Sequence, residues 1–268
     1  MSFFQNKVVA ITGGSDGIGK ALIDALIPLG AKVATCGRNY DKLYGLQMQY
    51  ANILLHTIVC DVSNEQDCKR FIDSTIKTFG NIDILINNAG ISMRALFKDT
   101  SLDVIRRVME VNFFGSVYCT KFALPEIIKQ KGTIVGISSV AGYRGLPGRS
   151  GYSASKFALQ GLLEALRTEL LDTGVNVMWV SPGFTTSNIR NVALNSVGES
   201  QGESPMDEKT LMSSPECARH IIKAIEKRKR TLVLTFSGNQ TVIMNKFFPK
   251  LADKLVHKYF FKEGKLVR

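Results

Sequence analysis

The run Val8-Val9-Ala10-Ile11-Thr12-Gly13-Gly14-Ser15-Asp16-Gly17-Ile18-Gly19 decides the fold of this chain. Its first five residues are apolar or β-branched, which favours a buried strand. An amphipathic pattern over 20–29 follows the glycines and ends at Gly30, a typical residue for closing a helix. A second strand is expected at 31–36. One strand–helix–strand unit of about 30 residues is therefore predicted.

The same alternation continues along the chain. Strands alternating with helices of roughly 10 to 20 residues predict a parallel sheet that is covered on both faces. No linker, repeat or low-complexity tract interrupts the pattern, so the prediction is a single α/β domain, doubly wound, over 1–237. Further strands are expected at 53–60, 82–87, 132–138, 175–180 and 231–236, and helices at 65–79, 102–130 (with a break at Pro125) and 152–171.

The glycine-rich turn is suited to holding a pyrophosphate. Glycine permits a tight turn and close backbone approach, and the helix N-terminus that follows attracts negative charge. The end of the second strand indicates which dinucleotide binds, because an acid there accepts the ribose hydroxyl of NAD whereas an arginine accommodates the 2′-phosphate of NADP. Here Arg38 stands at that position without an acid, which favours NADP(H) over NAD(H). Asp16 weakens this preference, and Arg38 as a solvated loop charge is the alternative.

Tyr152 and Lys156 lie four residues apart in the helix expected at 152–171. On a helix, positions i and i+4 share one face. A nearby ammonium favours the phenolate and lowers the pKa of a tyrosine, which would make Tyr152 a usable acid or base. The alternative is an ordinary pair of helix-surface neighbours.

Five motifs in order carry a resemblance to a known family. The chain resembles the classical short-chain dehydrogenase/reductase family over about residues 5 to 190. The resemblance implies a Rossmann-like fold and hydride transfer between NAD(P) and a carbonyl or alcohol. The motifs are Thr12-Gly13-x-x-x-Gly17-Ile18-Gly19, Asn87-Asn88-Ala89-Gly90, Ser138-Ser139, Tyr152-x-x-x-Lys156 and Pro182-Gly183.

The resemblance also implies roles for individual residues. Tyr152 would exchange the proton with the substrate oxygen, and Lys156 would lower its pKa and bind the nicotinamide ribose. Ser139, in preference to Ser138, would hold the substrate carbonyl, and Asn112 would support a proton path to the lysine. The implied cofactor contacts are Gly13, Ser15, Asp16, Gly17, Ile18, Gly19, Arg38, Asp61, Val62, Asn88, Ala89, Gly90, Tyr152, Lys156, Pro182, Gly183, Thr185 and Ser187, with Thr186 as an alternative to Ser187.

Composition sets the class of protein. Hydrophobic residues make up 45% and charged residues 21% of the 268, as in a globular protein. No signal-peptide or transmembrane pattern occurs, so a cytoplasmic protein is expected. The five dispersed cysteines are expected to be reduced core thiols, and with three isolated histidines they predict no metal site.

The charge of +11 is concentrated near the C-terminus, since residues 219–268 hold 13 Lys and Arg against 3 Asp and Glu, a net +10. The segment 238–268 is predicted to be a basic amphipathic helical extension, with Pro249 at the start of a helix. It could lie on an anionic membrane surface, or pack on its own domain or a partner subunit. No nucleic-acid module frames the lysines. Its apolar face is expected from Met244, Phe247, Phe248, Leu251, Leu255, Tyr259 and Phe260.

The substrate is the least determined part of the prediction. The extension resembles those of hydroxysteroid dehydrogenase-like and ketosphinganine reductase-like members, which implies a lipophilic carbonyl or alcohol. A ketoacyl reductase acting on an acyl carrier protein is the near alternative, and an inactive dinucleotide-sensing scaffold is a different class. A homodimer or homotetramer is implied by the family. The segment 191–214 is expected to be a mobile lid over the substrate, or else a solvated connection.

Overall fold

Seven parallel strands form the central sheet of the computed structural model, which describes residues 2–50 and 54–267. The strand order is β3-β2-β1-β4-β5-β6-β7. The described part of the strand expected at 53–60 begins at Leu55, and residue 53 lies outside the described residues. The strands are β1 (Val8–Thr12), β2 (Lys32–Gly37), β3 (Leu55–Val59), β4 (Ile84–Asn87), β5 (Thr133–Ile137), β6 (Asn176–Ser181) and β7 (Thr231–Val233).

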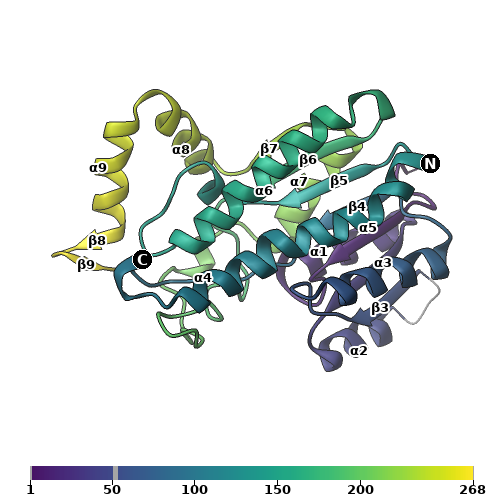
Figure 1. Ribbon diagram of the computed structural model, residues 1–268, viewed down its shortest axis with the longest axis horizontal. Coiled ribbons are helices and arrows are strands. Elements are labelled where there is room, and N and C mark those ends of the chain that lie inside the picture. The colour runs from purple at the N-terminus through teal and green to yellow at the C-terminus, as the bar shows by residue number, and fades with distance from the viewer. Residues whose placement is uncertain (1, 51–53, 268) are drawn as a thin grey trace.

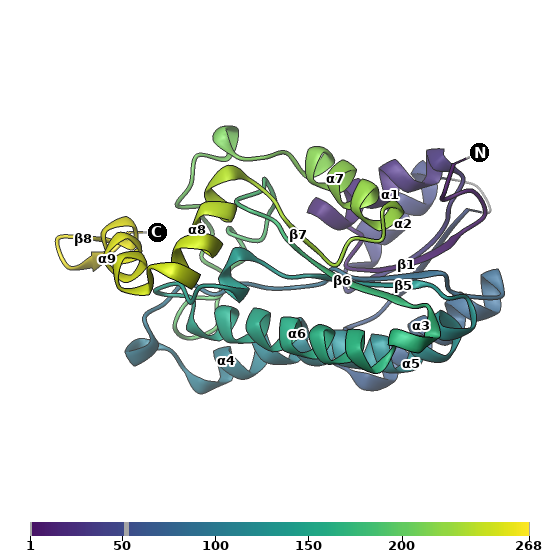
Figure 2. The same cartoon turned by 90° about the horizontal axis from the view of Figure 1, so that it is seen from above.

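Helices cover both faces of the sheet, as predicted (Figures 1 and 2). Each face has its own apolar core, because strands buried on both sides carry apolar residues that point in both directions. One face packs against α1 (Gly17–Leu26), α2 (Tyr40–Gln49) and α7 (Ser214–Glu226), and the other against α3 (Glu65–Phe79), α4 (Leu102–Met109), α5 (Gly115–Lys129) and α6 (Ser150–Glu169).

Three expectations about these elements were wrong. The helix expected at 102–130 is two helices joined by a π-helical turn, Glu110–Phe114, and Pro125 lies inside α5 without ending it. The last strand ends at Val233 instead of 236. Helices α2 and α7 were not expected, since both carry many charged and polar residues and gain their stability from packing on the sheet.

The sheet reverses its strand order at β1. From β1 the chain proceeds to β2 and β3 on one side, then returns to β4 and continues to β7 on the other. Loops therefore diverge between the carboxyl ends of β1 and β4, where open α/β sheets bind ligands. Thr12 ties these two ends together, because its hydroxyl accepts hydrogen bonds from the backbone N–H groups of Asn88 and Ala89, both at 3.0 Å.

The C-terminal extension stands beside the sheet and not under it (Figures 1 and 2). It consists of α8 (Phe236–Phe247), α9 (Pro249–Phe260) and a hairpin of β8 (Phe261–Lys262) and β9 (Lys265–Leu266). Pro249 begins α9, as predicted. The extension is attached to the loop before α6: Asn245 donates to the carbonyl of Tyr143 at 2.8 Å, and Asp253 pairs with Arg144.

All five cysteines are buried and free, as expected for core thiols. Four of them lie in a row, in the order Cys36, Cys60, Cys68 and Cys119, and neighbours in this row shift one another's pKa. They come from two strand ends and two helices, so their spacing in the chain does not indicate their contact.

Candidate active site

One cavity of about 460 Å³ opens at the carboxyl ends of β1, β4, β5 and β6. Its volume is in the range of small-molecule and cofactor sites. It brings together nearly all of the predicted site residues, namely Gly13, Ser15, Asp16, Gly17, Ile18, Arg38, Asp61, Val62, Asn88, Ala89, Gly90, Ser139, Tyr152, Lys156, Pro182, Gly183, Thr185 and Ser187.

The glycine-rich turn is suited to binding a dinucleotide where the turn meets the N-terminus of α1. Gly13 has φ of +71° and Gly17 has φ of +53°, which L side chains rarely adopt. A Cβ on Gly13 would also lie 2.9 Å from the Cα of Ala89. The turn thus keeps bare backbone facing the cavity at the N-terminus of α1, which suits the approach of a pyrophosphate.

Asp16 is paired at the mouth of this turn. It caps α1 by accepting from the N–H of Gly17 at 2.7 Å, and its other oxygen lies 2.7 Å from the ammonium of Lys42. The hydrogen bond from Lys42 lowers the pKa of Asp16. Lys42 also lines the cavity beside Arg38, so the charge of Asp16 is balanced and two cations face this end.

Tyr152 is half-buried in the first turn of α6 and lines the cavity. Burial raises its pKa, whereas a hydrogen bond with Ser139 and the positive charges of Arg149 and Arg190 act in the opposite direction. The net shift is upward, opposite to the direction expected from a lysine alone. The phenol therefore keeps its proton at neutral pH.

Lys156 lies behind Tyr152 on the same face of α6, with its ammonium 5.6 Å from the centre of the tyrosine ring. It is 4% exposed and donates to the carbonyl of Ile137 at 2.8 Å. Burial lowers the pKa of Lys156 to about 8. The i, i+4 spacing thus places a cation against the phenol, in the protein interior.

Asn112 does not line the cavity but lies directly behind it, in the π-helical turn. Its side-chain oxygen accepts from the N–H of Ile91 at 2.8 Å, and its amide donates to the hydroxyl of Ser155 at 2.9 Å. Ser155 in turn donates to the carbonyl of Tyr152 at 2.7 Å. This fully bonded side chain joins the loop after β4 to α6.

Gly19 also lies outside the cavity, against the carbonyl of Gly13.

The two adjacent serines have different surroundings. Ser138 is buried and accepts from the amide of Gln160 at 2.8 Å. Ser139 begins a short turn by accepting from the N–H of Ala141 at 3.1 Å, and it lines the cavity together with Tyr152, whose pKa it lowers. Ser139 is therefore the serine placed to share a ligand oxygen with Tyr152.

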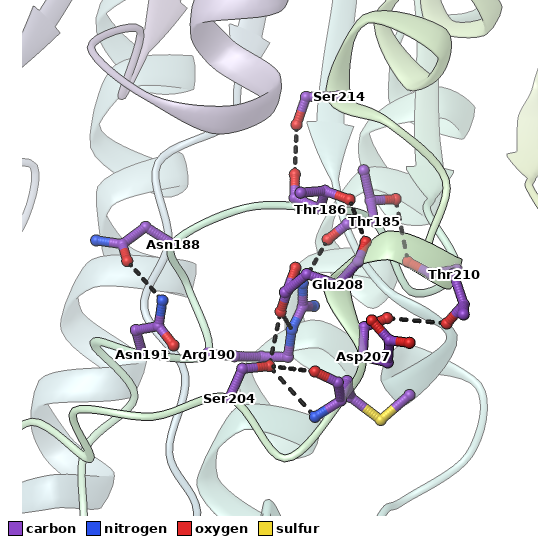
Figure 3. Close-up of polar contacts among 12 residues, drawn as sticks. Thr185, Thr186, Asn188, Arg190, Asn191, Ser204, Asp207, Glu208, Thr210 and Ser214 are labelled. Atoms are coloured by element: carbon purple, nitrogen blue, oxygen red, sulfur yellow. Dashed lines mark hydrogen bonds and ion pairs between the residues drawn. The ribbon is translucent and has the colours of Figure 1, made fainter.

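The segment 191–214 lines the cavity through Val192 and is hydrogen-bonded to the residues before it at several points. Arg190 donates to both carboxylate oxygens of Glu208, at 2.7 and 2.6 Å, and to the carbonyl of Thr185 at 2.8 Å (Figure 3). The guanidinium lowers the pKa of Glu208. The hydroxyl of Thr186 points away from the cavity and donates to the carbonyl of Glu208 at 3.1 Å. Of the two alternatives, Ser187 therefore lines the cavity and Thr186 does not.

Three cations that line the cavity were missed by the sequence prediction: Lys42, Arg149 and Arg190. Arg149 stands three residues before Tyr152, one helical turn away, and that spacing is a signal that could have identified it. No local signal marks Arg190, since its partner Glu208 lies 18 residues further along the chain.

Two relatives match almost the whole chain. Dehydrogenase/reductase SDR family member 7B of Rattus norvegicus is 34% identical over 98% of this chain and 84% of its own length. The 11-beta-hydroxysteroid dehydrogenase A of Arachis hypogaea is 35% identical over 92% of this chain and 73% of its own. The predicted resemblance to hydroxysteroid dehydrogenase-like members is thereby confirmed.

Solved structures confirm the fold. A short chain dehydrogenase/reductase from Burkholderia phymatum in complex with NAD has a TM-score of 0.83 at 22% identity, covering 94% of this chain and 96% of that one. One from Burkholderia cenocepacia in complex with NADP has a TM-score of 0.80 at 23% identity, covering 96% and 99%. The family model for short chain dehydrogenase matches residues 7–196. This chain belongs to the short chain dehydrogenase family and is an NAD(P)-dependent oxidoreductase.

Proposed function

We propose that this enzyme reduces a lipophilic ketone with NADPH, or oxidises the corresponding secondary alcohol, with Tyr152 as the acid or base. The observation that carries the proposal is that Ser139 and Tyr152 line the same cavity as the glycine-rich turn, with the ammonium of Lys156 5.6 Å from the tyrosine ring. A dinucleotide bound along that cavity supplies or accepts the hydride. The name of the plant relative, a hydroxysteroid dehydrogenase, supports a lipophilic substrate.

The residues of this chain divide the remaining work. Ser139 and Tyr152 donate hydrogen bonds to the carbonyl oxygen, where negative charge develops during reduction. Tyr152 then gives up its proton to that oxygen, and Lys156 stabilises the phenolate that remains. Because burial raises the pKa of Tyr152, the phenol is protonated at neutral pH and is ready to act as the acid in reduction.

A panel of ketones with increasing chain length and ring content, followed by NADPH absorbance, tests this function. We expect kcat/KM to rise with the apolar area of the ketone. Equal rates with small and large ketones would contradict the lipophilic substrate, and no turnover in either direction would contradict the function.

The preference for NADP(H) rests on Arg38 and Lys42. Both cations line the end of the cavity beside Ser15, and no acid stands at the end of β2, where Gly37 is followed directly by Arg38. A guanidinium binds phosphate oxygens through two parallel hydrogen bonds, which suits a 2′-phosphate. Lys42 also balances Asp16, the one residue in the turn that disfavours a phosphate.

Replacing Arg38 with alanine is expected to weaken NADPH binding by ~10–100-fold, the usual effect of losing hydrogen bonds to a charged group, and to leave NADH binding nearly unchanged. Isothermal titration with each dinucleotide measures this. The matched control is Arg106→Ala, which removes an exposed arginine far from the cavity. Equal losses for both dinucleotides would mean that Arg38 does not contact the 2′-phosphate.

We further propose that the extension binds an anionic membrane surface. The apolar face expected from sequence is largely uncovered: Phe247, Phe248, Leu251, Leu255 and Tyr259 are all exposed, whereas Phe260 is buried. Lysines recur beside this face at 246, 250, 254 and 258. Exposed aromatic residues with flanking lysines suit the interface of anionic lipids. No helix among the described residues is long and apolar enough to cross a membrane.

Co-sedimentation of the full chain with vesicles tests this surface. Phosphatidylserine-containing vesicles should bind the protein better than neutral ones. Changing Lys246, Lys250 and Lys254 to glutamine should weaken that binding by ~100-fold, at about 1 kcal/mol per lysine. Phe97→Ser, which removes an exposed aromatic residue elsewhere, is the control. If the triple variant binds as the wild type does, or if the face instead mediates dimer formation in solution, the membrane proposal fails.

A further inference from the structure

Arg149 is a buried cation in the cavity, and no acidic side chain among the described residues pairs with it. It is 8% exposed, and its Nη1 has no hydrogen-bond partner among the described residues. Its guanidinium lies 5.5 Å from the ring of Phe260 at the end of α9, a contact that offsets only part of the cost of burying a charge. An unpaired buried charge is strongly destabilising, so such groups occur where a ligand completes them.

The neighbouring arginines, unlike Arg149, have acidic partners. Arg190 is held by both oxygens of Glu208, and Arg94 donates to Gln201 and Glu203. Arg94 and Arg190 both lower the pKa of Arg149 by repulsion, after the larger effect of its burial. Three guanidinium groups therefore lie near one another. Two of them have a counter-charge from the segment 191–214, and the third has none among the described residues.

Arg149 and Tyr152 both line the cavity, and they are separated by one helical turn. A ligand atom bound to Arg149 would thus lie within a few bonds of the atom that reacts at Tyr152. The glycine-rich turn, Arg38 and Lys42 lie toward the carboxyl ends of β1 and β2, whereas Arg149 lies at the start of α6. Its position therefore suits the substrate rather than the phosphates of the dinucleotide.

We propose that Arg149 binds an anionic oxygen group of the substrate, a carboxylate or a phosphate, a few bonds from the reacting carbonyl. The substrate is then an amphiphile, with a charged head at Arg149 and an apolar remainder. A planar guanidinium binds either group through two parallel hydrogen bonds. This inference rests on the proposed function, since it names the substrate class of the same site.

Matched substrates test the proposal: an aliphatic oxo acid, its uncharged methyl ester and an oxoalkyl phosphate, each with NADPH. Arg149→Gln should lower kcat/KM by ~10–100-fold on the charged substrates, mainly through KM, because it removes hydrogen bonds to a charged group. It should lower kcat/KM for the ester much less, since the ester loses only the effect of the Arg149 charge on Tyr152, and Arg149→Lys should restore part of the loss. The relative rates with acid and phosphate identify the head group.

A binding measurement separates this proposal from the proposed function. A saturated alkyl carboxylate and an alkyl phosphate should raise the Tm of the wild-type protein but not of Arg149→Gln, whereas the corresponding alcohol should raise neither. Equal effects of Arg149→Gln on charged and uncharged substrates, or equal Tm shifts in both proteins, would overturn the role of Arg149. Turnover of none of these substrates or of the neutral ketones, with the Tm shifts intact, would overturn the proposed function alone.

Discussion

Tyr152→Phe is expected to lower kcat by ~10²–10⁴-fold, the usual contribution of a positioned general acid. Tyr152 lines the cavity together with Ser139, and phenylalanine in its place has no hydroxyl proton to deliver. The ring remains beside the ammonium of Lys156, so packing in the first turn of α6 should be preserved. Steady-state kinetics with the best ketone from the panel measures the loss.

Dinucleotide affinity separates chemistry from binding in this variant. We expect Kd for NADPH to change little, because the glycine-rich turn, Arg38 and Asn88 are untouched. Tyr44→Phe is the matched control, since it removes the same hydroxyl from an exposed tyrosine on α2. Turnover of Tyr152→Phe at the rate of Tyr44→Phe would rule out Tyr152 as the proton donor.

Lys156→Met is expected to have two effects: it should lower kcat, and it should remove the free-energy cost of burying a charged ammonium. A unit charge 5.6 Å from the tyrosine ring stabilises a phenolate by ~3 kcal/mol at an effective dielectric constant of about 20, so kcat should fall by ~100-fold. The same cation is buried at a cost, which lowers the pKa of Lys156 from 10.5 to about 8. Methionine fills a similar volume without that charge.

The stability effect has a definite pH dependence. With a folded-state pKa near 8 and an unfolded value of 10.5, the folded protein binds fewer protons between these values, so its free energy of unfolding rises with pH across that range. The free-energy cost of burying Lys156 in the folded protein acts in full below pH 8 and is absent above pH 10.5. Its size is ~3 kcal/mol, partly offset in the variant by the carbonyl of Ile137, which loses its donor.

Urea unfolding of both proteins at pH 7.5 and pH 10.5 measures this difference. The wild type should gain stability relative to Lys156→Met as the pH rises, with other titrating groups cancelling in the comparison. Lys77→Met, on the exposed side of α3, should show no such dependence. A stability difference between wild type and Lys156→Met that is the same at both pH values would contradict a buried, destabilised cation.

The sequence by itself determined the parallel sheet, the helices on both faces, and the positions of the glycine-rich turn and the Tyr152–Lys156 pair. These depend on local rules: apolar periodicity, the backbone freedom of Gly13 and Gly17, and the rise of a helix over four residues. The errors lie where tertiary packing overrides these local rules. The π-helical turn around Asn112 and the continuation of α5 through Pro125 are imposed by packing against the sheet and α6, which overrides the propensity of the individual residues.

Only the tertiary structure decided which charges in the cavity are paired. Arg190 binds Glu208 of the segment 191–214, and Lys42 binds Asp16 across 26 residues. Arg149 contacts an aromatic ring of α9 but no carboxylate in the part of the chain that the structure describes. The cysteines that form one row come from four elements in the same way. The physical reason is that burial and counter-charge depend on contacts between distant segments, whereas backbone geometry depends on neighbours in the chain.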